Sequence, residues 1–146
     1  MKTVAQMLHA KPQQQVHTVT AEVPMLDALR LLAEHNIGAL PVVRDGRIVG
    51  MLSERDVARG LVDRGAALLD TPVTELMTTR LTTCRPETTI EELMTMMTMR
   101  RIRHVPVLGE DGDLTGMISI GDVVKCRLDE LETEAQALRD YVAGVQ

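Results

Sequence analysis

The chain has 146 residues, of which 45% are hydrophobic and 25% are charged, and its formal net charge is −5. No segment holds the roughly 18 uninterrupted apolar residues of a membrane helix, and the N-terminus does not have the layout of a secretion signal. We therefore expect a soluble cytoplasmic protein without a membrane partner. The chain is acidic and has no Phe or Trp and one Tyr, which argues against nucleic acid as the primary partner, because polyanion binding needs basic surface and base stacking needs aromatic side chains.

The first predicted elements are an amphipathic helix and a β-hairpin. Pro24 suits the first turn of a helix, and apolar residues follow it at helical spacing. Two short apolar runs at 39–43 and 48–52 are joined by a turn sequence, RDGR, so they predict a hairpin. We expect a short additional strand near residues 16–19, with a counterpart near residues 81–84.

A second helix follows the hairpin. Ser53 opens this helix and Gly65 ends it. Val57, Leu61 and Val62 recur on one of its sides, so we expect that side to face the core.

The chain contains an internal duplication. Residues 37–57 (IGALPVVRDGRIVGMLSERDV) align with residues 102–123 (IRHVPVLGEDGDLTGMISIGDV), and about half of the positions are identical. The similarity extends upstream, because residues 4–8 (VAQML) correspond to residues 73–77 (VTELM). Units of this size bury little surface alone, so we expect the two to pack face to face around a pseudo-twofold axis.

The last segment departs from the repeat and predicts a long amphipathic helix. Apolar residues recur there at alternating spacings of four and three, as in a helical seam: Val124, Leu128, Leu131, Ala135, Leu138, Val142 and Val145. This helix either folds back on its own domain or packs against the same helix of a second chain. We favour the second arrangement, because a small two-lobed body offers limited surface to a long helix.

The hairpin-to-helix turns carry the chemically suggestive residues. Ser53 and Asp56 in the first unit correspond to Ser119 and Asp122 in the second. A helix N-terminus can hold a phosphate, and a carboxylate can accept hydrogen bonds from both ribose hydroxyls, so the pair suits a nucleotide. The same spacing also forms an ordinary helix cap that needs no ligand. Both interpretations stay open at this point.

The repeats resemble CBS domains, named after cystathionine β-synthase. The most specific parts are residues 39–43 and 50–56 in the first unit, and residues 104–107 and 116–122 in the second. The resemblance implies an α+β fold in which each repeat has a short β-sheet packed on two helices, and the two repeats form one module. The expected organisation is a repeat at 1–65, a repeat at 66–126 and a C-terminal amphipathic helix at 127–146.

The resemblance also implies a function. Members of this family bind AMP, ADP, ATP, S-adenosylmethionine or NAD-type ligands in clefts between two repeats and act as metabolite sensors. They typically dimerise. We therefore expect a regulatory protein that binds an adenine nucleotide, forms a homodimer and signals to an unidentified regulated protein.

Carried over residue by residue, the resemblance implies two unequal clefts. The first cleft is expected to contain Ser119, Asp122, Val16, His17, Thr18, Ile37, Arg103 and His104. The second is expected to contain Ser53, Arg55, Asp56, Gly38, Ala39, Leu81, Thr82, Thr83 and Ile102. Because Arg103 and His104 are assigned to one cleft and Arg55 to the other, the two should differ in how they hold phosphate.

Other functions fit the sequence less well. A structural or dimerisation protein with empty clefts is the main alternative, and a CBS protein that binds NAD(H) or S-adenosylmethionine is another. An enzyme is not expected, because the sequence shows no nucleophile–base pair, no Gly-rich phosphate loop and no metal-ligand spacing among its histidines. Cys84 and Cys126 are expected to be inert reduced thiols and not zinc ligands.

Overall fold

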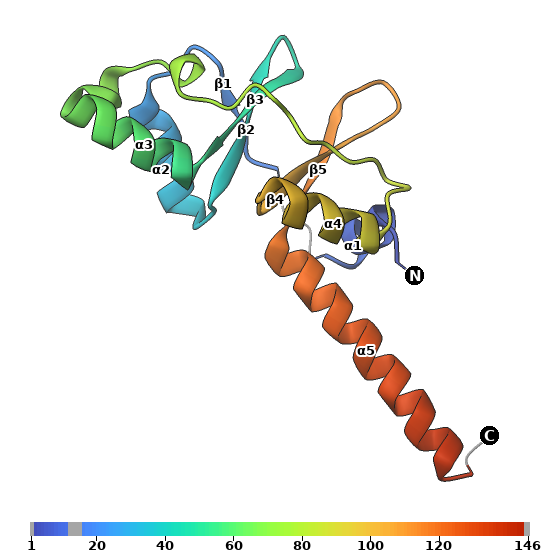
Figure 1. Ribbon diagram of the computed structural model, residues 1–146. Coiled ribbons are helices and arrows are strands. Elements are labelled where there is room, and N and C mark those ends of the chain that lie inside the picture. The colour runs from blue at the N-terminus through green and yellow to red at the C-terminus, as the bar shows by residue number, and fades with distance from the viewer. Residues whose placement is uncertain (1, 12–15, 145–146) are drawn as a thin grey trace.

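The computed structural model describes residues 2–11 and 16–144. It has the two α+β repeats and the long C-terminal helix that the sequence predicts (Figure 1). The elements in chain order are α1 (Val4–Ala10), β1 (Val19–Thr20), α2 (Met25–His35), β2 (Ala39–Arg44), β3 (Arg47–Ser53), α3 (Glu54–Arg64), the 3₁₀ helices η1 (Gly65–Asp70) and η2 (Val73–Glu75), α4 (Ile90–Arg100), β4 (His104–Leu108), β5 (Leu114–Ser119) and α5 (Ile120–Val142).

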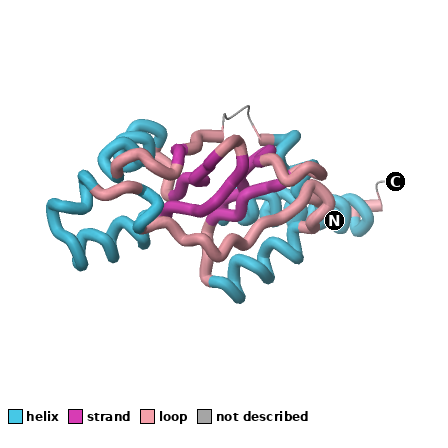
Figure 2. The backbone as a smooth tube through the Cα atoms, turned by 90° about the horizontal axis from the view of Figure 1, so that it is seen from above, coloured by secondary structure: helices cyan, strands magenta, loops and turns pink. Residues whose placement is uncertain are grey.

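Two small sheets occupy the middle of the molecule, with helices toward its two ends (Figure 2). The first sheet has the order β1-β2-β3, with β1 parallel to β2, and the second is the β4-β5 hairpin. Both predicted hairpins are confirmed. Asp45 and Gly46 form the first turn with positive φ, as a tight hairpin requires. The additional strand of the first repeat begins at Val19, later than expected, and its counterpart is a single bridge between Cys84 and Val107.

The two hydrophobic cores exchange segments between the halves of the chain. Val4 and Met7 of α1 are buried in the core of the second repeat, beside α4 (Figure 1). Val73 of η2 is buried in the core of the first repeat. Backbone hydrogen bonds fix both segments, from Val4 N to Thr88 O at 2.8 Å and from Val73 N to Val23 O at 2.9 Å. Each core therefore contains residues from both halves of the chain.

The exchanged segments pack against two glycines at equivalent positions of the repeats, Gly50 and Gly116. A Cβ at Gly116 would lie 3.0 Å from both terminal methyls of Leu8, and a Cβ at Gly50 would lie 2.5 Å from Met77 Sδ. Leu8 and Met77 occupy the same position of the upstream repeat. The glycine in each second hairpin strand thus makes room for an apolar side chain from the other half.

Helix α3 buries only part of the side that the sequence predicts, since Val57 packs partly buried against the core of the first repeat and the other two residues do not. Leu61 and Val62 are 50% and 87% exposed, whereas Asp56 and Gly60 are buried. The reason is close packing at Gly60, where an added Cβ would lie 2.6 Å from Leu68. The helix therefore approaches the core through its glycine side, and the expectation that Leu61 and Val62 face inward is wrong.

Helix α5 leaves the body and extends away from it (Figure 1). Its buried residues are Val123 and Cys126, near its start. The seam residues between 124 and 142 are exposed, and Val145 lies outside the described residues. The helix does not fold back on its own domain, so its apolar seam has no cover within the chain as described. None of the helices in the described ranges is long and apolar enough to cross a membrane.

Candidate functional site

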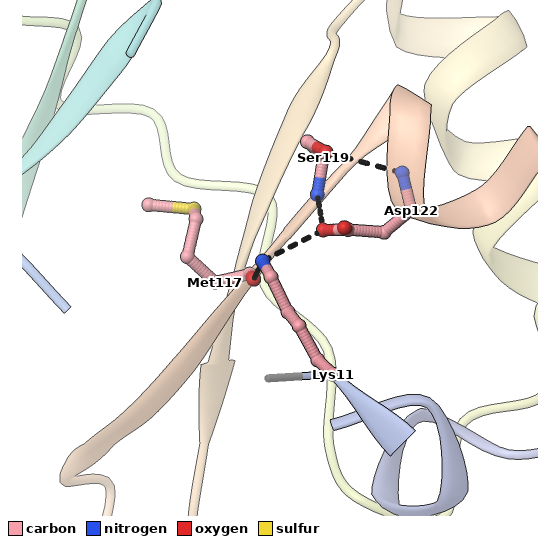
Figure 3. Close-up of polar contacts among 4 residues, drawn as sticks. All are labelled: Lys11, Met117, Ser119 and Asp122. Atoms are coloured by element: carbon pink, nitrogen blue, oxygen red, sulfur yellow. Dashed lines mark hydrogen bonds and ion pairs between the residues drawn. The ribbon is translucent and has the colours of Figure 1, made fainter. Parts of the chain in front are cut away.

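Both Ser–Asp pairs form complete helix caps. Ser53 Oγ accepts a hydrogen bond from the backbone N–H of Asp56 at 3.4 Å, and Asp56 Oδ2 accepts one from the backbone N–H of Ser53 at 2.9 Å. At the start of α5, the corresponding distances are 3.2 Å for Asp122 N to Ser119 Oγ and 2.8 Å for Ser119 N to Asp122 Oδ2 (Figure 3). The capping role is therefore confirmed. It fixes each carboxylate at the first turn of its helix, beside a cavity described below.

Lys11 reaches the second of these caps from the end of α1. Its ammonium donates to Asp122 Oδ2 at 2.9 Å and to the carbonyl of Met117 at 3.4 Å (Figure 3). Burial alone would raise the pKa of Asp122, but the Ser119 N–H and the Lys11 ammonium together hold it below its usual range. The carboxylate is thus ionised at neutral pH, and its Oδ1 accepts no hydrogen bond from the residues described.

Asp56 has a different set of partners. It is 8% exposed. In addition to the cap, its Oδ2 accepts a hydrogen bond from Ser53 Oγ at 3.1 Å, and its Oδ1 accepts one from Thr78 Oγ1 at 3.3 Å. Thr78 belongs to the exchanged segment after η2, so the second half of the chain helps to position the carboxylate of the first.

The larger cavity, which we call the Asp122 cleft, has a volume of about 1390 Å³. Its lining brings together six of the eight residues predicted for it: Val16, His17, Ile37, His104, Ser119 and Asp122. Gly38 and Ala39, predicted for the other cleft, also line it. Thr18 is not among the lining residues, although Val16 and His17 before it are. Lys11 and His35 also line this cleft, and the His35 ring stacks on His17 at a centroid distance of 3.5 Å.

The smaller cavity, the Asp56 cleft, has a volume of about 440 Å³. Eight predicted residues line it: Gly38, Ala39, Ser53, Arg55, Asp56, Leu81, Thr82 and Ile102. Thr83 does not line it, whereas Leu81 and Thr82 before it do. The contacts of these residues with a ligand remain predictions.

Arg103 corrects the predicted division of cations. It lines the Asp56 cleft and not the Asp122 cleft, whereas His104 lines both. Sequence reasoning also missed Arg59 and Arg80 in the Asp56 cleft, and it considered Arg101 for phosphate binding without assigning it to a cleft. Of these, Arg59 could have been found, because it lies one helical turn after Arg55.

His104 and Gly38 lie where the two clefts meet, since both residues line both cavities. A Cβ at Gly38 would lie 3.3 Å from His104 Cε1 and 2.9 Å from Glu54 Oε1. Burial lowers the pKa of His104, while the carboxylates of Glu54 and Asp122 act in the opposite direction. The ring is therefore largely neutral at pH 7.

The structure gives no support to a metal centre within the described ranges, where no group of three or more His, Cys, Asp or Glu side chains could hold an ion. Cys84 and Cys126 are free and buried. Burial raises the pKa of the Cys84 thiol to about 11 and also raises that of Cys126. Both thiols are protonated at neutral pH.

Comparisons with known proteins identify the family. A family model for the CBS domain matches residues 5–63 and 73–129. The CBS domain-containing protein CBSX3, mitochondrial, of Arabidopsis thaliana is 38% identical over 130 residues, which cover 86% of this chain and 63% of that protein. The chain thus spans less than two thirds of this relative.

Solved structures show the same fold. The crystal structure of a CBS-domain containing protein from Agrobacterium tumefaciens matches with a TM-score of 0.81 and 41% identity, and the match covers 86% of this chain and 99% of that one. CBSX2, whose crystal structure is a complex with AMP, matches with a TM-score of 0.74 and 30% identity over 87% of this chain and 96% of that one. With both of its repeats matched, the chain belongs to the CBS domain family as a tandem pair.

Proposed function

We propose that this protein is a cytoplasmic, homodimeric regulatory module that binds an adenine nucleotide in the clefts between its two repeats and signals to a partner protein. The observation that carries the proposal is the repeated geometry of Asp56 and Asp122. Each carboxylate is fixed by a helix cap at the edge of a cavity with walls from both repeats. The binding of AMP by the related CBSX2 supports an adenine nucleotide as the ligand class. The cytoplasmic location remains a prediction from the sequence.

The side chains of each cleft suit the parts of a nucleotide. The ribose hydroxyls donate to the aspartate carboxylate, which in Asp122 has one oxygen free of hydrogen bonds from the described residues. The adenine lies between apolar side chains, such as Ile37 in the Asp122 cleft and Ile102 in the Asp56 cleft. The phosphates face the backbone N–H groups of the helix start and the cations of the lining.

A signalling mechanism is possible because residues from both repeats line each cleft. A ligand in the Asp122 cleft contacts Ile37 and His17 from the first repeat and Ser119 from the second. Binding therefore favours the arrangement of the repeats that closes on the nucleotide, and a partner that distinguishes the two arrangements responds to its concentration. The exposed seam of α5 supports the homodimer, because an apolar stripe of this length needs a cover.

One observation favours a second candidate, a structural protein with empty clefts. Both Ser–Asp pairs already have a complete use as helix caps. A protein without a ligand would keep the same residues for this purpose alone.

The test is isothermal titration with AMP, ADP, ATP, S-adenosylmethionine and NADH on the intact chain and on Asp56→Asn and Asp122→Asn. A lost hydrogen bond to a charged group costs about 1.5–3 kcal/mol, so each variant should bind the nucleotide of its own cleft roughly 10- to 100-fold more weakly. Asp63→Asn, on the exposed side of α3, is the control for the change of charge. Absence of binding by all five compounds, or unchanged binding by both variants, would leave the pairs as caps and favour the structural protein.

A further inference from the structure

The Asp56 cleft collects an unusual number of arginines for its size. Its lining of about 440 Å³ contains Arg55 and Arg59 from α3, Arg80 from the segment between the repeats, and Arg101 and Arg103 from the segment between α4 and β4. The lining has two carboxylates, those of Glu54 and Asp56. The arginines therefore come from three separate segments and exceed the acids around one cavity.

The side chains of these arginines have no polar partner among the described residues. Within residues 2–11 and 16–144, none of the five forms a salt bridge or a side-chain hydrogen bond, whereas Arg44, Arg64 and Arg127 all pair with glutamates. Asp56 forms no salt bridge with them in the described residues, and its two oxygens accept hydrogen bonds from Ser53 and Thr78. All five side chains are exposed. Because they line one small cavity, an anion bound there would be attracted by several guanidinium groups at once.

Arg101 adds a second, independent observation. It adopts a left-handed backbone conformation with φ of 53°, at the end of α4. The equivalent position of the first repeat is Asn36, with φ of 52°. Asparagine tolerates this conformation better than most residues with a side chain, and arginine has no such advantage. The second repeat thus accepts a less favourable residue at the rim of this cleft, as expected where the side chain has a use beyond the fold.

The Asp122 cleft has lysines and no arginines among its described lining residues. Lys2, Lys11 and Lys125 line it together with Asp122 and Asp129, and no arginine is among its lining residues as described. The ammonium of Lys11 is already paired with Asp122. An ammonium is a compact charge, whereas guanidinium groups bind phosphate oxygens in pairs. The two clefts therefore differ in the ligand charge that they can compensate.

We infer that the Asp56 cleft selects ligands with an extended polyphosphate, a nucleoside triphosphate over the monophosphate, and that Arg101 and Arg103 bind the distal phosphates. The inference rests on the proposed function for the nucleoside part of the ligand. The distal phosphates extend from the start of α3, beside Arg55, toward the segment between α4 and β4. Because that segment belongs to the second repeat and α3 to the first, the polyphosphate joins the two repeats.

The test compares AMP, ATP and inorganic tripolyphosphate by isothermal titration at one fixed salt concentration without divalent cations. The intact chain should bind ATP at least about tenfold more tightly than AMP, as expected for one or more added charge-assisted hydrogen bonds. In Arg101→Gln/Arg103→Gln, this ratio should fall to within about threefold. Arg30→Gln/Arg44→Gln removes the same charge outside both clefts and should behave like the intact chain.

The outcomes separate this inference from the proposed function. Equal binding of AMP and ATP by the intact chain, or a preference for ATP that survives in Arg101→Gln/Arg103→Gln, overturns the inference and leaves nucleotide binding in place. If no nucleotide binds, the proposed function fails. In that case, tripolyphosphate binding that Arg101→Gln/Arg103→Gln abolishes still supports the anion site, and the absence of tripolyphosphate binding overturns it as well.

Discussion

Replacing Gly50 by alanine should destabilise the protein far more than the same change at its repeat equivalent, Gly116. A Cβ at Gly50 would lie 2.5 Å from Met77 Sδ, 2.9 Å from Met77 Cγ and 3.1 Å from the carbonyl oxygen of Thr78. That carbonyl is held by the backbone N–H of Met51 at 2.9 Å, so it cannot retreat without loss of a hydrogen bond. The three atoms nearest to a Cβ at Gly116 all belong to the side chain of Leu8, with its terminal methyls at 3.0 Å, and a rotation of that side chain can relieve the contact.

The magnitudes follow from overpacking and from the entropy of the unfolded chain. Overpacking costs about 1–3 kcal/mol, and glycine-to-alanine replacement returns about 0.4–1 kcal/mol where the backbone suits alanine. We expect a net loss of about 2 kcal/mol for Gly50→Ala and less than about 0.5 kcal/mol for Gly116→Ala. For a chain of this length, the first value lowers Tm by about 4–8 °C.

Urea unfolding at equilibrium, read by circular dichroism, measures both free energies. The cycle Gly50→Ala, Met77→Ala and the double variant isolates the contact, and the double variant should recover about 1 kcal/mol relative to the sum of the single changes. Equal stability of Gly50→Ala and the intact chain, or a larger loss for Gly116→Ala, would refute the account of the exchanged segments given above.

Three further predictions concern the helix seam, the shared histidine and the thiols. Leu131→Asp should convert a dimer to a monomer in sedimentation equilibrium, because it places a charge in the exposed seam of α5. The matched control, Thr133→Asp, should remain a dimer. A dimeric Leu131→Asp would place the interface elsewhere. Burial lowers the pKa of His104 below its ordinary value of 6.5, so between these two values the unfolded chain binds the proton more readily than the folded chain. The free energy of unfolding should therefore fall as the pH drops from 6.5 toward the pKa of the folded state, and level off below it. His104→Gln should flatten that part of the pH profile of urea unfolding, and an unchanged slope would contradict the assignment. The buried Cys84 and Cys126 should not react with a thiol reagent at about pH 8 until the protein is denatured, and rapid reaction of the native protein would show that they are accessible.

Local patterns predicted the elements of this fold well. The hairpins follow from short apolar runs around turn residues, and the caps at Ser53 and Ser119 follow from the spacing to an acidic residue three positions later. Both patterns act within a few residues of the chain, so no knowledge of the tertiary structure is needed to interpret them. The internal duplication then indicated that the two halves share one architecture.

Features that depend on distant contacts were not predictable in the same way. The buried side of α3 is set by the packing of Leu68 against Gly60. This contact leaves Leu61 and Val62 exposed, although they are apolar. The pairing of Lys11 with Asp122 joins residues 111 positions apart, and no spacing rule could suggest it. For the same reason, the hydrophobic pattern of residues 4–8 and 73–77 does not show which of the two cores each segment enters.

That exchange sets the smallest part of this chain that can fold on its own. A fragment cut between the repeats would lose Val73 from one core or Val4 and Met7 from the other, and would expose an apolar hollow beside Gly50 or Gly116. The repeat visible in the sequence is therefore not an independent folding unit, although it is the unit of duplication. Unfolding of the body should follow as a single cooperative transition, in which neither half survives the loss of the other.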